Sequence, residues 1–593
     1  MNIELSIIQE KNLIRVNPQD AVNLNIDTIK MTLIRFGYKV ADIHIEIDNN
    51  MLSGKIEISE NVIKRLQLPV TESYLIQVKN NELILGPYIG LYMSPKAEIS
   101  GWKIERLKSF ILRFKSEING VMIAFTYEDI NFEKLEVNAF YYDSINDIWV
   151  RKKMPLPTVI HRYGDMNKSV RNRLRAIYGN NLFNYDELDK WSEISGLIQD
   201  KTTKKYISDT KLCENIDMFK AFINQYDDFY FKPIKGRKGR GIHRIEKESE
   251  SGYYLTVQAI KEYEKIKYDN VEDLIAHLYE AIHSKDYILQ RTIKLSVDNR
   301  VIDFRVRFEK NLEAEWELSI FAARVSGEGG VVSNRSAGGE VIPPIEALTK
   351  YYGFGEEKAK RVEKELVIAG EAITKAVEKS HVTYLKCAVD LGVEPDGTIY
   401  HIETNVKAPN DLTTRSFEGY AGLDRACSLN SLYCKRMTGF KDVNKLLSFS
   451  TVHRNNSCKS KKGSYLITFG GSNRTKATIE MIKETFLKAN LEINFELVKK
   501  FHYQFIVYGV EENIVDTIKT IKEQDVENII RTVLIETSKT DDKVKKKGKN
   551  NHNQILQVEN QKLKKEIEKM KESTSWQISK PIRLLGKIFK KEK

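Results

Sequence analysis

Residues 386–405 read KCAVDLGVEPDGTIYHIETN, two strand-like runs on either side of a turn sequence. Pro395-Asp396-Gly397 is typical of a tight turn, so the stretch predicts a β-hairpin. Folding the chain at this turn sets Asp390 roughly opposite Glu403. Asn405 shares a strand face with Glu403, because residues two apart point to the same side of a strand. We therefore expect three oxygen-bearing side chains to converge on one face of the hairpin.

Carboxylate and amide oxygens are hard donors, which suit Mg²⁺ together with substrate phosphates. An alternative is that these side chains form the solvated face of an ordinary antiparallel hairpin. Asp390, however, lies inside the apolar run CAVDLGV, where an unpaired carboxylate is costly. The sequence therefore favours a metal site formed by Asp390, Glu403 and Asn405.

A second candidate site lies upstream, in FYFKPIKGRKGRGIHRIE at residues 229–246. A predicted strand presents Lys232, and the loop after it contains Gly236, Gly239 and Gly241. Glycines let backbone N–H groups approach an anion closely, and a lysine adds a positive charge. The stretch indicates phosphate binding, although a basic β-hairpin turn is the alternative. It is not a Walker loop, because G-x-x-x-x-G-K-[ST] is absent.

Between these two stretches lie arginines on predicted strands, Arg305 in DFRVRF and Arg324 in AAR. Asn334 and Gly338-Gly339 follow in the loop VVSNRSAGGE. Arginines next to a metal–phosphate site would neutralise charge that develops on a transferred phosphoryl group. Surface arginines on exposed strands are the alternative.

The chain is too long for one core, since 593 residues predict about three or four domains. Residues 154–162 contain two prolines and indicate a linker between domains. The apolar spacing of residues 356–379 predicts a long helix, and residues 464–536 predict a βαββαβ order. We expect an α/β and α+β multidomain fold. Its predicted parts are a mixed α/β region at 1–155, a central domain at 156–440, a small ferredoxin-like domain at 460–540, and a basic spacer, short helix and amphipathic tail at 541–593.

The net charge of +12 is concentrated in the tail, where residues 541–593 carry 16 Lys/Arg against 7 Asp/Glu. The preceding residues carry only +3, so no nucleic-acid partner is expected. Basic and apolar residues at 576–593 indicate peripheral contact with an anionic membrane, the alternative being a solvated lysine-rich tail. The charged start and the lack of an 18-residue apolar run predict neither a signal peptide nor a membrane-spanning helix. Five cysteines without a C-x-x-C fit a reducing cytoplasm.

Taken in order, these motifs resemble the ATP-grasp superfamily. The resemblance is carried by Lys232 before a glycine-rich loop, YILQRTIKL at 287–295, D-F-R-V, Arg324, N-x-x-x-G-G and D…E-x-N. It looks most similar to glutathione-synthetase and glutamate-ligase relatives and, more closely, to the YheC/YheD endospore-coat-associated family. That family has a segment like LGPYIGLY (85–92) near its N-terminus. The resemblance covers roughly residues 50–435.

The resemblance implies an ATP-grasp core that binds ATP and Mg²⁺. By it, Lys232 contacts the phosphates, the loop with Gly239 and Gly241 covers them, and Asp390, Glu403 and Asn405 ligate Mg²⁺. A second lysine that contacts the nucleotide is expected upstream. Lys201, Lys204 and Lys205 are the alternatives, and we choose Lys205. The backbone of Leu289 and Gln290 would hold adenine, Asp298 the ribose, and Arg305 and Arg324 would face the γ-phosphate and the acyl phosphate.

The implied activity is that of an ATP-dependent carboxylate–amine ligase in bacterial envelope or spore-coat biogenesis. Its substrates would be a small-molecule or peptide carboxylate and an amine. The chain departs from the family pattern after Asn405, where it reads NVKAPND instead of N-x-x-P-G or N-S-K-P. A non-catalytic scaffold of the spore coat or of cell-surface polysaccharide assembly is therefore the alternative. We expect a cytoplasmic protein, peripheral to the inner face of the membrane or associated with the spore coat, and a homo-oligomer is left open.

Overall fold

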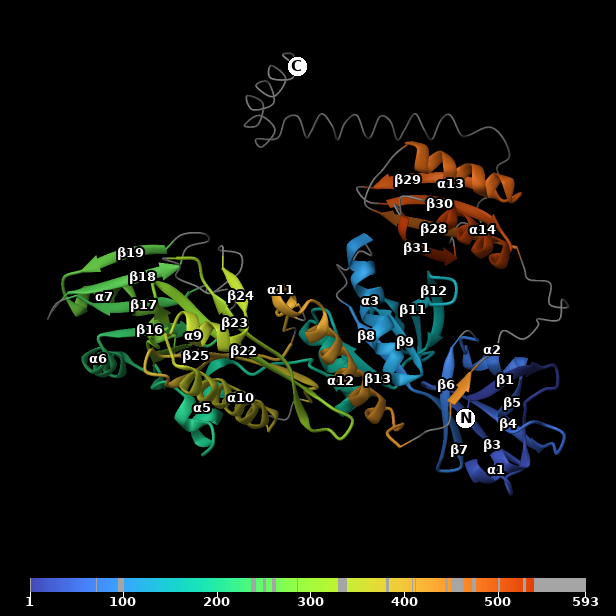
Figure 1. The fold of residues 1–593 in the computed structure, drawn as a ribbon, viewed down its shortest axis with the longest axis horizontal. Helices are drawn as coiled ribbons and strands as arrows, with labels where there is room; N and C mark the ends of the chain where they lie inside the picture. The colour runs from blue at the N-terminus through green and yellow to red at the C-terminus, as the bar shows by residue number, and fades with distance from the viewer. Residues whose placement is uncertain are drawn as a thin grey trace, which may run out of the picture. The chain divides into compact units, whose positions relative to one another are not determined.

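The computed structural model describes most of the chain up to Thr537. The described residues are 2–70, 72–93, 101–235, 241–248, 252–258, 263–284, 286–328, 339–379, 383–407, 409–410, 412–442, 446–448, 462–471, 476–499, 502–525 and 530–537. They divide into two compact units, residues 1–457 with 531–534 and residues 458–530 with 535–593. Figure 1 labels their helices and strands. The predicted basic tail at 541–593 lies outside the described residues.

The first unit begins with a closed β-barrel whose strand order is β1-β27-β6-β7-β3-β4-β2-β5. The strand β27 comes from far along the chain and lies parallel to β1 and antiparallel to β6. The barrel is therefore completed by a segment that follows the ATP-grasp-like region, which the sequence analysis does not anticipate. The elements are β1 (Asn2–Ile8), β2 (Leu13–Val16), α1 (Pro18–Leu24), β3 (Met31–Phe36), β4 (Lys39–Ile47), β5 (Lys55–Ser59), α2 (Glu60–Leu66), β6 (Ser73–Lys79), β7 (Glu82–Gly86) and β27 (Leu446–Ser448).

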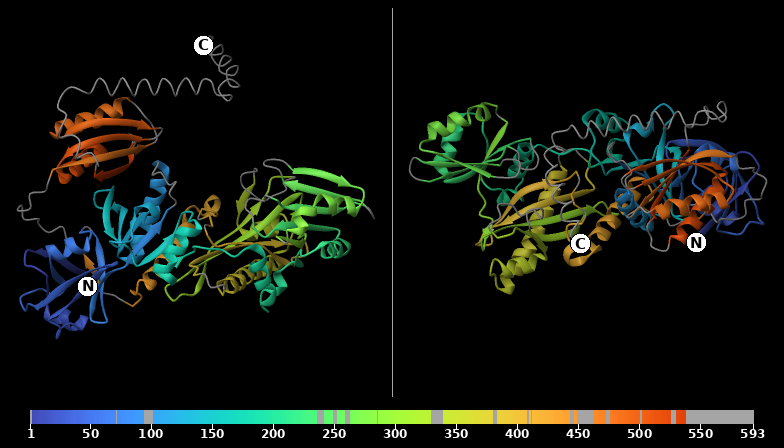
Figure 2. Two further views of the ribbon diagram at one scale, coloured as in Figure 1. Left: turned by 180° about the vertical axis from the view of Figure 1, so that it is seen from behind. Right: turned by 90° about the horizontal axis from the view of Figure 1, so that it is seen from above.

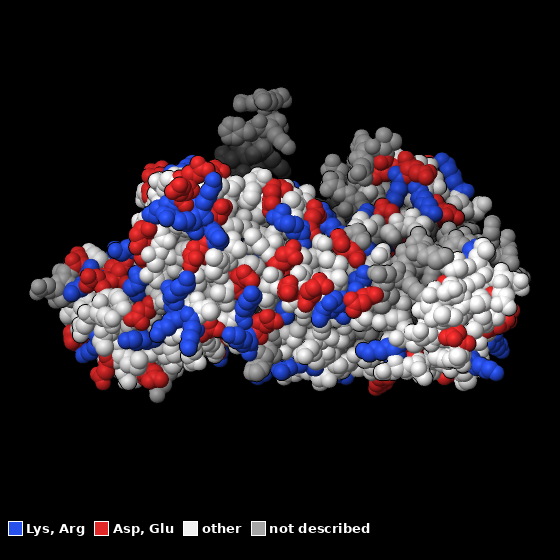
Figure 3. All heavy atoms as spheres, turned by 60° about the horizontal axis from the view of Figure 1, so that its bottom comes forward, with Lys and Arg blue, Asp and Glu red and all other residues white. Residues whose placement is uncertain are grey.

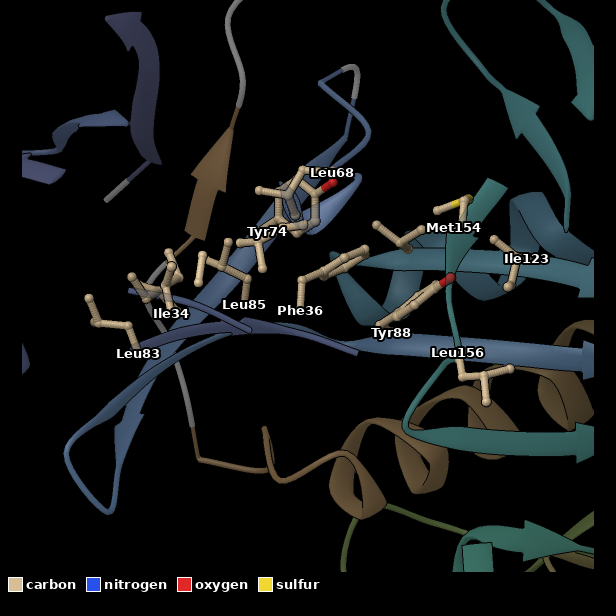
Figure 4. Packing of buried hydrophobic residues seen from close by; sticks show 14 of the residues in the cluster. Ile34, Phe36, Leu68, Tyr74, Leu83, Leu85, Tyr88, Ile123, Met154 and Leu156 are labelled. Atoms are coloured by element: carbon tan, nitrogen blue, oxygen red, sulfur yellow. The ribbon is translucent and has the colours of Figure 1, made fainter. Parts of the chain in front are cut away.

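Buried aromatic residues join the barrel core to the strand that follows it. The rings of Phe36 and Tyr88 stack with centroids 4.3 Å apart, as Figure 4 shows. The Tyr88 hydroxyl donates a hydrogen bond to the Pro155 carbonyl at 2.8 Å. Stacked aromatic contacts add to the stabilisation that burial provides, so this packing stabilises the junction between the barrel and the strand that follows it.

The second sheet has the order β14-β13-β8-β9-β11-β12, and β10 (Ile130–Asn131) pairs with β11. The prediction of a linker at 154–162 is wrong, because β13 (Val159–Arg162) is a fully buried strand that pairs in parallel with β8 and β14. Prolines are tolerated where a strand ends, and Pro155 is the last residue of β12. The other elements are β8 (Tyr88–Tyr92), α3 (Gly101–Ile118), β9 (Val121–Phe125), β11 (Glu136–Asp143), β12 (Ile148–Pro155), α4 (Lys168–Tyr178) and β14 (Leu182–Phe183).

A six-stranded antiparallel sheet of order β15-β20-β16-β17-β18-β19 carries Lys232. Phe229 and Phe231 are fully buried against helices on one side of this sheet, so Tyr230 and Lys232 point to the other side. Figures 1 and 2 show this sheet in green with its helices on one side. Its elements are β15 (Thr210–Leu212), α6 (Ile216–Gln225), β16 (Asp228–Pro233), β17 (His243–Lys247), β18 (Tyr253–Gln258), β19 (Tyr263–Tyr268), α7 (Val271–His277), α8 (Tyr279–His283) and β20 (Tyr287–Arg291).

A further sheet, within the predicted central domain at 156–440, has the order β24-β23-β22-β25-β26. The short strand β21 (Ser296–Val297) pairs with β22. Phe304, Val306 and Phe308 are buried in one core with residues of α10, so the alternate residues of β22 face away from that helix. The structure confirms the predicted long helix as α10 and the predicted hairpin as β25 and β26. The elements are β22 (Arg300–Lys310), β23 (Trp316–Val325), β24 (Glu340–Ile342), α9 (Pro344–Lys350), α10 (Glu356–Glu378), β25 (Lys386–Val393), β26 (Ile399–Asn405) and α12 (Ala421–Met437).

Residues 463–537 have the predicted βαββαβ order, with their strands arranged as β31-β28-β30-β29. Residues of both helices, including Phe486 and Ile518, are buried together with Phe469 and Phe505 of the sheet. The chain is therefore a mixed α/β and α+β multidomain protein, as expected. The elements are β28 (Gly463–Gly471), α13 (Lys476–Lys488), β29 (Glu492–Lys499), β30 (His502–Gly509), α14 (Glu511–Gln524) and β31 (Ile530–Thr537).

The described surface carries both signs of charge. On the face shown in Figure 3, lysine and arginine side chains alternate with aspartate and glutamate side chains. This mixture agrees with the charge count, which leaves little net charge outside the tail. Among the helices that the structure describes, none is long and apolar enough to span a membrane.

Candidate functional site

Lys232 lies on the side of its sheet that the helices leave open. Its ammonium donates a hydrogen bond to the Gln290 side-chain oxygen at 2.7 Å and lies 4.6 Å from the centre of the Tyr230 ring. The Gln290 amide in turn donates to the Thr210 hydroxyl at 3.1 Å. Three neighbouring strands, β15, β20 and β16, therefore hold the one cationic group in place.

A second lysine, Lys190, lies close enough to Lys232 to interact with it electrostatically. Lys190 is the first residue of α5 (Lys190–Gln199), which Asp189 caps by accepting a hydrogen bond from the Ser192 N–H at 2.9 Å. Its ammonium donates to the Pro233 carbonyl at 3.2 Å. Lys190 is not among the residues predicted from the sequence. The signal that could have found it is an Asp directly before a predicted helix, because such a cap fixes where the helix begins.

Burial disfavours the charged form of both lysines. Burial, together with the nearby charge of Lys190, lowers the pKa of Lys232 to about 8. Burial also lowers the pKa of Lys190. The Glu403 carboxylate opposes both shifts. Two partly buried ammonium groups that share one carboxylate are a favourable environment for a further anion, because an anion would relieve their repulsion.

The three lysines proposed from sequence are placed differently. Lys205 belongs to η3 (Lys204–Tyr206), and its ammonium is paired at 2.8 Å with Glu365 of α10. Lys201 and Lys204 are exposed. The structure thus places Lys190 close enough to Lys232 and Glu403 to interact with them electrostatically, whereas Lys205 is paired with Glu365 of α10.

Asp390 is held between the two predicted arginines. Arg305 donates to its two oxygens from Nε and Nη2, each at 2.7 Å, and Arg324 donates to one of them at 2.9 Å. Arg324 is also paired with Asp303, so two guanidinium groups alternate with two carboxylates. Burial opposes ionisation of Asp390, but the charges of Arg324 and Arg305 outweigh it and lower the pKa of Asp390 to about 2.

The predicted convergence of Asp390, Glu403 and Asn405 is present in the structure. Asp390 pairs with Glu403 in the register of β25 and β26. The Asn405 amide donates to the Glu403 carboxylate at 2.8 Å and to the Asp390 carboxylate at 3.3 Å. One N–H donor group thus lies between two carboxylates, a position in which a small cation would also be stabilised.

The donor set fits Mg²⁺, which is usually bound by one or two carboxylates together with substrate phosphates. Within the described ranges, no group of three or more His, Cys, Asp or Glu side chains is arranged to hold a metal by itself. The site would therefore need the Asn405 oxygen and ligands from a bound nucleotide. That requirement agrees with the two nearby lysines, which favour an anion.

Gln290, one of the remaining predicted residues, contacts Lys232. Leu289 and Gln290 belong to β20, which is paired with β15 on one side and β16 on the other, so the Gln290 side chain reaches the site. Asp298 is exposed in the turn between β21 and β22, with φ of 50°. Gly241 ends the glycine-rich loop with φ of 72°, which favours glycine. Gly236, Gly239, Asn334 and Gly338 lie outside the described residues. That Leu289 and Gln290 hold adenine and Asp298 the ribose stays a prediction.

Part of the chain matches a known protein family. Residues 179–434 match the family described as YheC/D like ATP-grasp. The chain is 22% identical over 391 residues to the endospore coat-associated protein YheD of Bacillus subtilis (strain 168), a match that covers 62% of this chain and 83% of that protein.

Two solved structures similar to this chain are synthetases by name. D-cycloserine synthetase DcsG has a TM-score of 0.34 and 11% identity over 59% of this chain and 99% of its own. D-alanyl-alanine synthetase A from Vibrio cholerae O1 biovar eltor str. N16961 has a TM-score of 0.34 and 12% identity over 58% of this chain and 98% of its own. The family match, which contains Lys190, Lys232, Arg305, Asp390 and Glu403, confirms the resemblance of residues 179–434 to the YheC/D-like ATP-grasp proteins.

Proposed function

We propose that this protein binds Mg-ATP and uses it to activate a carboxylate as an acyl phosphate, which an amine then attacks to form an amide. The observation that carries the proposal is the position of Glu403. Its carboxylate interacts with both Lys190 and Lys232, and through Asn405 it is joined to Asp390. Glu403 thus adjoins both the two lysines that we propose bind phosphate and the oxygens that we propose hold Mg²⁺.

Each side chain has a role that follows from its charge. Lys190 and Lys232 would bind phosphate oxygens, and Glu403, Asn405 and Asp390 would hold Mg²⁺. When bound, Mg²⁺ would draw negative charge from the phosphates. Arg305 and Arg324 would stabilise charge on the transferred phosphoryl group, because guanidinium groups match phosphate geometry.

The balance of charge around Asp390 supports this assignment of the arginines. Arg305 and Arg324 alternate with Asp303 and Asp390, so the four groups have no net charge by themselves. Sharing Asp390 with a divalent cation would make this group positive. The arginines would then attract a phosphoryl group only when the metal site is filled, which couples nucleotide binding to phosphoryl transfer.

A thermal-shift titration tests nucleotide binding. Saturating Mg-ATP should raise the melting temperature of the full chain, because a ligand that binds only the folded state stabilises it. Adding EDTA should reduce that rise. The Glu403→Gln variant should require more Mg²⁺ for the same rise, whereas Glu371→Gln, which alters an exposed pair with Lys375 on α10, should not. A wild-type protein without any Mg-dependent response to ATP would contradict the proposal.

The carboxylate substrate can be sought by its chemistry. With carboxylate labelled by ¹⁸O, an acyl phosphate transfers one labelled oxygen to the phosphate that is released. Detecting labelled phosphate in mass spectra would identify both the reaction and the acid. If the released phosphate carried no label with any of the carboxylates that stimulate ATP consumption, the acyl-phosphate route would be excluded.

The name of the relative YheD suggests a place for such an activity. YheD is described as endospore coat-associated. We propose that this protein acts on a carboxylate or amine of the spore coat or cell envelope. Purification of coat and cytoplasmic fractions, followed by detection of the chain with an antibody, would test that location.

A further inference from the structure

The buried side chain of Asn184 joins the two strands of the β25–β26 hairpin at their open end. Its amide donates a hydrogen bond to the Lys386 carbonyl at 2.9 Å and another to the Val406 carbonyl. Its oxygen accepts from the Leu385 N–H at 3.0 Å. Asn184 has no solvent exposure, so these bonds are protected from water.

The backbone of Asn184 suits this task. Its φ of 53° lies in the left-handed region, which asparagine tolerates better than most residues. Its own N–H donates to the Thr383 carbonyl at 3.0 Å. Asn184 directly follows β14, which pairs with β13 in the preceding sheet. The residue therefore connects that sheet to the start of β25 and the end of β26.

A second residue supports the same point of the hairpin. Arg162, the last residue of β13, is almost fully buried. Its guanidinium donates to the Lys407 carbonyl at 3.1 Å and, more weakly, to the Asn184 carbonyl at 3.5 Å. Two side chains from outside the hairpin thus hold consecutive carbonyls, those of Val406 and Lys407, immediately after Asn405.

The consequence concerns Asn405 itself. In the register of the hairpin, Asn405 pairs with Ala388, the last pair before the strands part. A residue at the end of a strand pair lacks the restraint that further pairs would give, so its side-chain direction depends on what holds the next residues. Here the carbonyls of the next two residues are fixed by Asn184 and Arg162. These bonds restrain the backbone next to Asn405, whose amide donates to Glu403 and Asp390.

We propose that Asn184, supported by Arg162, is a positioning residue that sets the affinity of the site for Mg²⁺ by fixing Asn405. This inference rests on the proposed function, because Asn405 is a ligand only if the site binds Mg²⁺. Partners that orient metal ligands are typically worth about 10–100-fold in metal affinity. We expect an effect near the lower limit, because Asn184 acts on the ligand through the backbone.

The Asn184→Asp variant tests the inference with little change of shape. It keeps an acceptor for the Leu385 N–H and tolerates the left-handed backbone. It replaces the donating amide with an oxygen that faces the Lys386 and Val406 carbonyls. The Mg²⁺ concentration that half-saturates the ATP-dependent thermal shift should rise about tenfold. Binding of Mn²⁺ in the presence of ATP, followed by electron paramagnetic resonance, should weaken by the same factor.

Asn180→Asp is the matched control, since Asn180 is exposed and its side-chain oxygen accepts a hydrogen bond from the Thr383 hydroxyl at 3.3 Å. It should leave the Mg²⁺ midpoint unchanged. A purely structural role for Asn184 would lower the melting temperature without ligand and leave the Mg²⁺ midpoint as in the wild type. That result would overturn the inference while the proposed function stands.

If Asn184→Asp does not fold, Arg162→Lys decides the question, because it keeps the charge but shortens the reach to the Lys407 carbonyl. A Mg²⁺ midpoint that rises at least threefold in this variant supports the inference, and an unchanged midpoint overturns it. A wild-type protein that shows no Mg-dependent binding of ATP overturns the inference together with the proposed function. The wild-type titration therefore separates the two failures.

Discussion

Arg305 donates two parallel hydrogen bonds to the Asp390 carboxylate, each 2.7 Å long. The pair connects the neighbouring strands β22 and β25, and the Asp390 side chain has only 5% exposure. Paired bonds of this kind combine charge with a fixed geometry, so they are stronger than neutral hydrogen bonds. Asp390 is thus a predicted metal ligand that also holds a predicted phosphate-binding arginine in place. A substitution of Asp390 should therefore affect the stability of the fold as well as metal binding.

Replacing Asp390 with Asn should destabilise the fold itself. The substitution leaves Arg305 and Arg324 buried with one carboxylate instead of two, and breaking a buried pair typically costs about 3–5 kcal/mol. Glu403→Gln should cost far less, because Glu403 is exposed. Urea denaturation of both variants without ligand measures the difference. Equal free energies of unfolding would show that the Arg305–Asp390 pair contributes little to stability.

Replacing Lys190 with Ala should weaken ATP binding more than replacing Lys205 with Ala. Lys190 is next to Lys232, whereas the Lys205 ammonium is exposed and paired with Glu365. A hydrogen bond to a charged group contributes about 1.5–3 kcal/mol, so affinity should fall about tenfold or more in Lys190→Ala. Isothermal titration calorimetry with Mg-ATP checks both variants. If Lys205→Ala weakened ATP binding more than Lys190→Ala, the nucleotide lysine would be Lys205, as predicted from the sequence.

ATP binding should weaken as the pH rises above about 8. The pKa of Lys232 is lowered to about 8, so the free protein loses this proton above that pH, while a bound phosphate favours the charged form. Binding must then take up a proton, and affinity falls by up to about tenfold per pH unit. The stability of the ligand-free protein should change in the opposite sense and increase over this pH range. An unfolded lysine keeps its proton to about pH 10.4, so this group adds stability as the pH rises from about 8 toward that value.

The Lys232→Arg variant provides the control for this pH dependence. An arginine keeps its charge across the whole range, so the decline in ATP affinity between pH 8 and pH 10 should largely disappear. Calorimetry in buffers with different ionisation enthalpies would count the protons taken up by each protein. Proton uptake that is the same in wild type and variant would assign the titration to another group.

Disrupting β27 should loosen the N-terminal barrel without removing the nucleotide site. Leu447 pairs with Ile3 of β1 and with Tyr74 of β6, and a proline there cannot donate to either neighbour. In Leu447→Pro, hydrogen exchange should accelerate in β1 and β6 while ATP binding persists. Leu447→Thr retains the N–H group and should exchange more slowly than the proline variant. Unchanged protection in Leu447→Pro would mean that the barrel holds without its closing strand.

Local patterns were sufficient for the elements whose signals lie close together in the chain. The turn sequence at Pro395–Gly397 predicted the hairpin, and the period of two along each strand predicted that Asp390 would lie opposite Glu403. The apolar period of residues 356–379 predicted α10, and alternating strand and helix patterns predicted the βαββαβ order of residues 463–537. In each case the interactions that form the element connect residues a few positions apart, so the pattern contains them.

Contacts between distant residues were decided only by the folded chain. Nothing local to Leu446–Ser448 shows that this strand closes a barrel made by the first 86 residues. Residues 154–162 looked like a linker because prolines break local structure, yet burial between β8 and β14 makes part of them a strand. Lys190 was hidden for the same reason. Asp189 marks the start of a helix at Lys190, but it does not show what that lysine lies near. The proximity of Lys190 to Lys232 and Glu403 depends on how three separate elements pack, which burial and charge over long separations decide.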